Sequence, residues 1–543
     1  MLRRFSRLIV ALAAIALPSS IVAQEKSAPL LTGDRTIPQA IDHYVELAQR
    51  ESKTPIAAIA DDSELLRRWM LDLVGRIPVD AELNEYLASS DADKKTKLVD
   101  RLLASPGFVR HQTQEMAVLL QASKKGKKSL YEYVQAATAE NRPWDRVFRE
   151  IITPDEKDAK QEGASEFLKS RVKELDRLTI DVSNTFFGVN VSCAQCHDHP
   201  LVPTWTQDHF YGLKAFFVRS VDAGGFLGEK DFGVVKYIPN KGKEKIAPPM
   251  FLTGKKIDDP GLKEATGEQK KKETERLETA KKSKKPPEPA AFSLRAKLAE
   301  TALAPDQRMF FSRAIVNRLV HRLTGRGLVM PLDQMHLENP ASHPELLQWL
   351  GRDLEEHGYD LRRLVRGIVL SNTYARASRW EGDNAPQEKW YAMANVRPLT
   401  PHQMAASLKI AAMDQTSLPA DPKERDKRIE DVVRGSEGLA VHFPQPAENF
   451  QVSVTEAMLF ANNETLTKQL LEGPSTLVFR MKAENDLEKR AELAVRTVMS
   501  RKARPDEVQA IVGYLQRRTD RVEAACQQVV WSLMTSAEFR FNH

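Results

Sequence analysis

The sequence predicts a mainly α-helical protein: two helical domains with a small irregular or β excursion and a charged linker between them. Apolar residues recur at helical spacing through residues 35–220 and again through 291–543. Residues 221–290 differ. They begin with a Gly-rich stretch that contains short strand-like runs, and end in a Lys/Glu-rich segment, 256–290, with few apolar residues to bury. We therefore expect the main domain boundary in this charged segment, as an exposed helix or a disordered linker.

The first predicted domain, residues 35–220, consists of short helices with short connections. A helix from about Asp62 presents an apolar face as far as Val74 and ends at Gly75, a residue that favours helix termination. Another helix is expected at 166–182, shortly before a pair of cysteines. The regular apolar stripes indicate core packing and an all-α domain.

The second predicted domain, residues 291–543, is again helical. A strongly amphipathic helix covers 313–323, and Pro344 stands at the first turn of another, where its missing N–H costs nothing. Residues 415–440 are expected to be rich in loops. Further helices are expected near 464–471, 485–500, 506–519 and 521–535.

The composition excludes some functional classes. The chain has 543 residues, of which 42% are hydrophobic and 28% charged, so it has ample material for hydrophobic cores. A net charge of +6 is small for this length, and the basic runs lack interleaved aromatic residues. Nucleic acid is therefore not an expected partner.

The N-terminus has the pattern of a secretory signal peptide at residues 1–23. Three arginines precede a short apolar run at 8–17, Pro18 breaks that run, and Ala23 offers a small residue for cleavage. No later segment reaches the length of about 18 apolar residues that a membrane span requires. We expect export to the periplasm or the extracellular side of the cell envelope, and no transmembrane helix in the mature chain.

The chemistry of the chain is concentrated in Cys193-Ala-Gln-Cys196-His197. Two thiols at this spacing, followed at once by a histidine, are typical of c-type haem attachment. Each thiol binds one vinyl group of the same porphyrin, and the histidine becomes the proximal ligand of the iron. The sequence therefore predicts one haem c held by Cys193, Cys196 and His197, with a role in redox or electron transfer.

Two other interpretations of the cysteines remain open. Cys193 and Cys196 can form a disulfide or a redox pair, because an exported protein meets an oxidising environment. A structural zinc site needs a second pair of cysteines, whereas the only other thiol is Cys526, which lies on an apolar helix face and is expected to be buried and free.

The distal side of a haem is not fixed by the sequence. His209, Met250 and His343 are candidate sixth ligands. The aromatic residues at 205–217 can line a haem crevice, or they can simply form the core of the helix that follows the motif.

A metal site without haem is the main alternative function. His197, Asp198 and His199 offer two imidazoles and a carboxylate within three residues, and His209 follows ten residues after His199. These donors suit zinc or iron in a metal-dependent hydrolase or a polysaccharide-associated protein, with His199 and His209 as weaker candidate ligands than His197. A structural envelope protein with no cofactor and a Cys193–Cys196 disulfide is the third possibility. No other catalytic signature stands out, so enzymatic activity stays open.

The residues resemble a family of large secreted proteins of planctomycetes and related bacteria, built from two linked domains of unknown function. The motifs of the first domain lie at 71–78, 98–106, 193–200, 205–207 and 211–217. Those of the second domain lie at 316–318, 325–329, 342–347, 371–374 and 536–543.

The resemblance implies an exported and mostly helical protein, and it carries no established reaction. Many relatives have a separate cytochrome c domain at the N-terminus that this chain lacks, so any haem must sit at residues 193–197. Relatives are often encoded beside sulfatase-like secreted proteins, which implies such a protein as a possible partner. The redox partner stays unknown.

Overall fold

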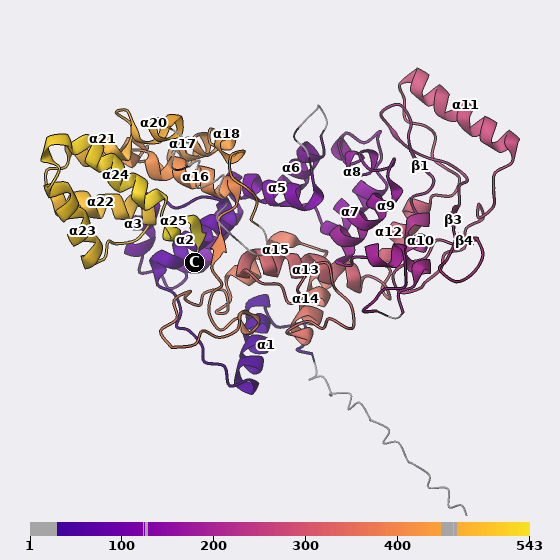
Figure 1. The fold of residues 1–543 in the computed structure, drawn as a ribbon, viewed down its shortest axis with the longest axis horizontal. Coiled ribbons are helices and arrows are strands. Elements are labelled where there is room, and N and C mark those ends of the chain that lie inside the picture. Colours follow the sequence, from indigo (N-terminus) through magenta and orange to yellow (C-terminus); the bar gives the residue numbers. More distant parts are fainter. Residues whose placement is uncertain (1–29, 123, 125–128, 203, 447–459, 461–463) are drawn as a thin grey trace, which may run out of the picture.

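The computed structural model describes residues 30–122, 124, 129–202, 204–446, 460 and 464–543. This part of the chain is built mainly of helices with a few two-stranded sheets, which confirms the predicted fold class (Figure 1). Within it, no helix combines the length and the apolar character needed to cross a membrane. The predicted signal peptide, 1–23, lies outside the described residues.

The helices of the first half are short, and many begin at a side-chain cap. At the start of α2, for example, the Asp61 carboxylate accepts the backbone N–H groups of Ser63 and Glu64. The α-helices are α1 (Ile37–Glu51), α2 (Asp62–Trp69), α3 (Asp80–Ala88), α4 (Lys94–Leu103), α5 (Pro106–Leu120), α6 (Leu130–Ala139), α7 (Trp144–Ile152), α8 (Glu166–Lys169), α9 (Leu175–Val182) and α10 (Gln207–Ala215).

Two π-helices extend α-helices of this half. η1 (Met70–Val74) continues α2, and η3 (Ser183–Phe187) continues α9. Each ends at a glycine with positive φ, 72° at Gly75 and 66° at Gly188, which terminates the helix without steric cost. Wide π turns are frequent near functional sites, and periodicity alone cannot distinguish them from α-helix. The remaining short helices are the 3-10 segments η2 (Ala159–Gln161), η4 (Ser192–Gln195), η5 (Glu388–Trp390), η6 (Gln415–Ser417) and η7 (Thr519–Arg521).

The helix predicted at 166–182 is interrupted between α8 and α9. The Arg171 guanidinium at this corner donates to the Phe167 carbonyl at 2.8 Å and to the Asp181 carboxylate at 2.7 Å. These bonds satisfy a terminal carbonyl of α8 and stabilise the bend.

The predicted β excursion is present as two antiparallel hairpins. They are formed by β1 (Ser220–Asp222) with β2 (Leu227–Glu229), and by β3 (Val235–Tyr237) with β4 (Lys245–Ala247). The charged segment that follows forms α11 (Gly267–Ser283), which lies along the outside of the hairpins (Figure 1). Only Glu273, Leu277 and Ala280 of this helix are buried, so the exposed-helix interpretation of the segment is the correct one.

The second half adds most of the remaining helices. One pair of strands, β5 (Arg397–Pro398) and β6 (Phe541–Asn542), joins its middle to the chain end. The helices are α12 (Leu294–Ala302), α13 (Met309–Thr324), α14 (Pro344–Glu356), α15 (Leu361–Val369), α16 (Pro401–Ala412), α17 (Pro422–Arg434), α18 (Glu437–Ala440), α20 (Glu464–Leu471), α21 (Leu477–Ala483), α22 (Leu487–Met499), α23 (Pro505–Gln516), α24 (Val522–Met534) and α25 (Ala537–Arg540).

The expectation of a loop-rich stretch at 415–440 is wrong, because α17 and α18 occupy most of it. α17 buries only Arg425, Ile429 and Val433, one residue per turn, among many charged residues. This narrow stripe is a weak periodic signal. The stronger signal was the start of the helix, where Asp421 caps the backbone and Pro422 occupies the first turn.

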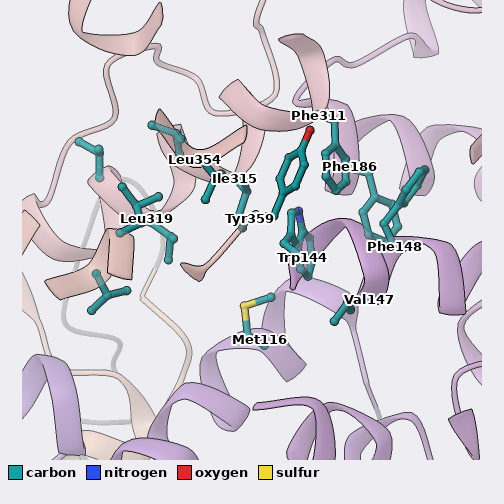
Figure 2. Close-up of a cluster of buried hydrophobic side chains, with 14 of the residues drawn as sticks. Met116, Trp144, Val147, Phe148, Phe186, Phe311, Ile315, Leu319, Leu354 and Tyr359 are labelled. Carbon is teal, nitrogen blue, oxygen red and sulfur yellow. The ribbon is translucent and has the colours of Figure 1, made fainter. Parts of the chain in front are cut away.

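Two large hydrophobic cores, and a small cluster between α10 and the β3–β4 hairpin, hold the described elements together. The first contains residues from Ile37 to Tyr391, so it includes parts of both predicted domains, whose boundaries stay a prediction. Figure 2 shows how the halves meet there: Trp144 and Phe148 of α7 lie against Phe186 of η3 and Phe311 of α13. The second core consists mainly of residues 399–539, together with Leu71, Ile77 and Val79 of the first half; it includes the buried free thiol of Cys526.

A buried polar network also connects distant parts of the chain. The carboxylate of Asp72, in η1, is 4% exposed. It accepts two hydrogen bonds of 2.8 Å from Arg397, one of 2.7 Å from the Tyr374 hydroxyl and one of 2.9 Å from the Asn542 amide. Four donors from three separate segments thus replace the water that this charge loses on burial.

Replacing Asp72 by Asn should therefore destabilise the fold strongly, because the Arg397 guanidinium would keep its burial and lose its counter-charge. We expect a loss of about 3–5 kcal/mol in the free energy of unfolding, measured by urea titration. The matched control is Asp100→Asn, which breaks a 2.6 Å ion pair with Arg366 that is exposed on both sides. This change should cost less than about 1 kcal/mol, and equal losses for the two variants would contradict the assignment.

Candidate functional site

The segment that carries the two thiols is fixed to α10. Ala194, between the cysteines, is 1% exposed and packs into the first core. The Gln195 carbonyl accepts hydrogen bonds from the Gln207 amide and the Tyr211 hydroxyl, both at 3.2 Å. The Gln195 amide in turn donates to Asp176 at 3.0 Å. The backbone between the thiols is therefore held in one conformation.

Asp198 has a structural role in this arrangement. Its carboxylate accepts the backbone N–H of Gln207, the first residue of α10, at 3.2 Å. A negative charge at this position also stabilises the helix dipole. The carboxylate that we considered as part of a metal-binding cluster thus supports the helix start.

The second half of the chain braces the residues just before the motif. The Asn190 N–H donates to the Asp333 carbonyl at 2.7 Å, and the Met335 N–H donates to the Gly188 carbonyl at 3.0 Å. Gly188 also lies close to α13, where a β-carbon in its place would come within 3.3 Å of the Ala314 methyl group. The motif is therefore placed by contacts from both halves.

The two thiols themselves face solvent. Cys193 and Cys196 are both exposed and both free, so the disulfide considered as an alternative is not formed in this structure. Cys526 is buried in the second core and is the third free thiol. Cys193 and Cys196 are thus the thiols that a reactive group can approach from outside.

His197 is exposed, and its ring has a defined orientation. Its Nδ1 lies 2.7 Å from the backbone carbonyl of Asp198. A carbonyl oxygen only accepts, so Nδ1 carries the proton and donates it. In the neutral ring, Nε2 then holds the free lone pair; metal-binding histidines often have this arrangement, with the other ring nitrogen donating to a backbone carbonyl.

His199 and His209 have the opposite arrangement. Nδ1 of His199 accepts the backbone N–H groups of Leu201 at 3.3 Å and Val202 at 3.1 Å. Nδ1 of His209 accepts the backbone N–H of Thr206 at 3.2 Å, as part of the cap of α10. Nε2 must then carry the proton in the neutral ring, so neither imidazole offers a free lone pair. Both weaker candidate ligands have structural roles here.

A preformed metal centre is also missing from the part of the chain that the structure describes. These residues bring no three His, Cys, Asp or Glu side chains together in a way that could hold an ion. The histidine at 199 is 4% exposed and lies edge-to-face against Trp205, with ring centroids 5.6 Å apart. The alternative of a zinc or iron site at His197, Asp198 and His199 therefore loses His199, and it keeps the exposed side chains of His197 and Asp198 as its donors.

The aromatic residues after the motif form core. Phe210, Phe216 and Phe217 are completely buried in the first core, and Trp205 is 7% exposed. Of the two interpretations of this aromatic stretch, the structure favours core packing over a preformed haem crevice.

The candidate sixth ligands also lie in packed surroundings. Met250 is 4% exposed and packs against Gly212 of α10. A β-carbon added at Gly212 would come within 2.6 Å of the β-carbon of Met250. His343, just before α14, is 3% exposed, and its ring lies 5.5 Å from that of Tyr391 and 6.4 Å from that of Trp390. None of the contacts found for these two side chains involves residues 193–197.

One histidine near the motif was missed. The His336 ring lies 5.7 Å from that of His199 and 6.0 Å from that of Trp205. Both of its nitrogens are buried and have no hydrogen-bond partner among the described residues. Its local sequence carries no motif, so only the pairing of 188–190 with 333–335 could have placed it here. Two leucines that follow these histidines in the sequence lie on the surface: Leu337 is 89% exposed and Leu201 is 59% exposed.

Comparison with protein families gives two matches. A model described as PSCyt2, a protein of unknown function (DUF1549), covers residues 40–222. A model described as PSD1, a protein of unknown function (DUF1553), covers residues 294–438. No curated protein and no solved structure matches the chain. The first match contains the two-thiol motif, and the second contains the segment that braces it.

The two kinds of histidine should respond differently to replacement. His199→Phe removes the acceptor of two backbone N–H groups, so we expect a loss of about 1–3 kcal/mol in the free energy of unfolding, measured by urea titration. His197→Phe is the matched control at an exposed position and should change stability by less than about 0.5 kcal/mol. The reverse order of the two effects would show that the rings are assigned wrongly.

Burial of His343 should make stability fall in acid. Burial lowers the pKa of His343 to about 4, below the unfolded value of about 6.5. The stabilising effect is thus complete above about pH 6.5 and is lost as the pH falls through about 4. Urea titrations should show that the free energy of unfolding of the wild type is lower at pH 4 than at pH 7. His343→Phe should reduce this difference by about 3 kcal/mol. The exposed control His43→Phe should leave that difference unchanged, and an equal effect of both variants would contradict the assignment.

Proposed function

The chain carries both domains of a planctomycete-type two-domain family of unknown function, and we propose that it is an exported protein that holds one c-type haem and acts in redox or electron transfer at the cell envelope. The observation that carries the proposal is the state of the motif: two exposed free thiols with two residues between them, followed by an exposed histidine whose Nδ1 is held by a backbone carbonyl.

The residues present fit the chemistry of haem attachment. Each thiol adds across one vinyl group, so that a carbon–sulfur bond forms at one vinyl carbon and the thiol proton moves to the other. Cys193 and Cys196 would hold the two sides of the porphyrin in this way, and Nε2 of His197 would face the iron. The bound group would supply one-electron transfer.

The surroundings of the motif support a solvent-facing group. Gln195 and Ala194 fix the backbone, so the exposed thiols are accessible to a reacting group without rearrangement of the core. The aromatic residues that follow fill the interior, which leaves the outer face of the motif accessible to a redox partner. The exposed side chains of Leu201 and Leu337 offer apolar surface of the kind that packs against a porphyrin edge.

The proposal requires export, because haem of this type is attached outside the bacterial cytoplasm. The basic and apolar pattern of residues 1–23 supports it. The sulfatase-like partner that the resemblance implies stays a prediction, and enzymatic activity stays open.

A second candidate function rests on the same two thiols. Exposed, free cysteines in a Cys-x-x-Cys arrangement can also form a reversible disulfide and exchange electrons with other thiols. In that case Cys193 and Cys196 would act without any bound group.

The test is a pyridine haemochrome spectrum of the full-length protein, exported in a host with cytochrome c maturation and extracted with acidic acetone. We expect haem that resists extraction in the wild type and none in the Cys193→Ser, Cys196→Ser double variant. Cys526→Ser is the matched control, because it removes the third thiol from a buried site, and it should retain the haem.

His197→Ala should keep the covalent haem and change its absorption spectrum, since the proximal ligand is lost. Absence of haem in the wild type would remove the first proposal. Labelling of Cys193 and Cys196 with a maleimide, before and after reduction, would then test the dithiol alternative.

A further inference from the structure

A second group of polar residues lies between α5 and α13, and the haem proposal does not use it. Arg318, His321 and Arg322 occupy one face of α13, three and four residues apart. His111 and Glu115 lie one turn apart on α5. We call these five residues the α5–α13 site; in Figure 1 the two helices come from different halves of the chain.

Hydrogen bonds around Asp72 bring the two helices to the same place. Arg397 uses one nitrogen to donate both to Asp72, at 2.8 Å, and to the Arg322 carbonyl, at 2.6 Å. On the other side, the His111 ring packs against Gly75, where a β-carbon would come within 2.7 Å of Nδ1. Gly75 ends the π-helix that contains Asp72, so α5 and α13 approach the same short segment.

The guanidinium of Arg322 has no counter-charge in contact with it. Within the described chain, no ion pair and no side-chain hydrogen bond involves it, although it is only partly exposed. The nearby Asp72 carboxylate is already neutralised by Arg397. Glu115 interacts with Arg322 electrostatically, yet no direct bond joins them. Unpaired burial of a charge is costly, so a partner for this guanidinium would stabilise the protein.

Several other polar atoms at this place are also unpartnered. Nδ1 of His111 is buried without a hydrogen-bond partner in the described structure, as are Nε of Arg322 and Nε of Arg397. His111 is 2% exposed. Buried polar atoms normally have a partner, so these three atoms together favour a polar group that the protein chain itself does not supply.

The electrostatic environment agrees with this interpretation. Burial lowers the pKa of Arg322, and the Glu115 carboxylate counteracts that effect. Burial also raises the pKa of Glu115, which favours its neutral form. Arg318 donates to the Asn184 carbonyl at 2.6 Å and has no ion pair among the described residues. The α13 side of the site is therefore electropositive.

We propose that the α5–α13 site binds an oxyanion, a carboxylate, phosphate or sulfate group, with Arg322 as its principal donor. The planar guanidinium fork matches the paired oxygens of such groups and forms charge-assisted hydrogen bonds with them. His321 and Arg318, one turn away on the same face of α13, extend the donor surface. Neither the site nor its test depends on haem at residues 193–197.

The test is isothermal titration calorimetry of the full-length exported protein with sodium acetate, phosphate and sulfate, each at constant ionic strength balanced with chloride. We expect saturable binding of at least one of the three anions by the wild type. Arg322→Gln should weaken that binding at least tenfold.

The matched control is Arg313→Gln. Arg313 is a partly buried arginine of the same helix, but it lies against Gly351 of α14, away from the site. This variant should bind as the wild type does. Should Arg322→Gln not fold, as judged by circular dichroism, Arg322→Lys takes its place, since it keeps the charge and loses the fork.

Either of two results would overturn the proposal: no saturable binding of any of the three anions by the wild type, or equal binding by the wild type and the Arg322 variant. Equal weakening by the Arg313 and Arg322 variants would also contradict it, because the effect would then reflect overall charge.

Discussion

The structure depends on one buried carboxylate, that of Asp72. Its four hydrogen bonds come from Tyr374, Arg397 and Asn542, which are widely separated in the sequence. A charge removed from water is stable only when its partners are in place, so all these segments must assemble together. The strand pair β5–β6 also ties distant segments together, because it joins residues 397–398 to the C-terminal end of the chain.

This constraint agrees with the packing of the two matched family domains, which share a core. The first hydrophobic core includes residues from both, and the residues before the motif bond to the 333–335 segment of the second. The exposed motif at 193–197 is consequently held by packing and hydrogen bonds from both halves of the chain. Such rigid support suits a site whose function requires two thiols and an imidazole to keep their relative positions.

Much of the fold follows from the sequence, whereas the roles of the histidines do not. The helix start at Asp61 and the stop at Gly75 have clear local signals, and the helix start at Asp421 was overlooked although its cap is of the same kind. By contrast, His197, His199 and His209 all belong to one short stretch rich in polar and aromatic residues. Their roles are distinguished only by which backbone group each Nδ1 meets, and that depends on the turn between them.

Long-range features were beyond prediction for a related reason. His336 reaches the motif through a pairing between segments more than a hundred residues apart, and Arg322 is recognised as unpaired only when Asp72 is seen to bond to Arg397. Periodicity describes which face of a helix is apolar, and it contains no information about which polar groups meet across a core. The two π-helices are hidden similarly, since their apolar pattern is close to that of an α-helix.

The most direct test of the central claim is the mass of the peptide that contains Cys193 and Cys196, released from the exported protein by protease and measured by mass spectrometry. Covalent haem predicts a peptide heavier by one haem, with both thiols blocked against alkylation. An unmodified peptide with two thiols that alkylate, or one lighter by two hydrogen atoms as in a disulfide, would contradict the account.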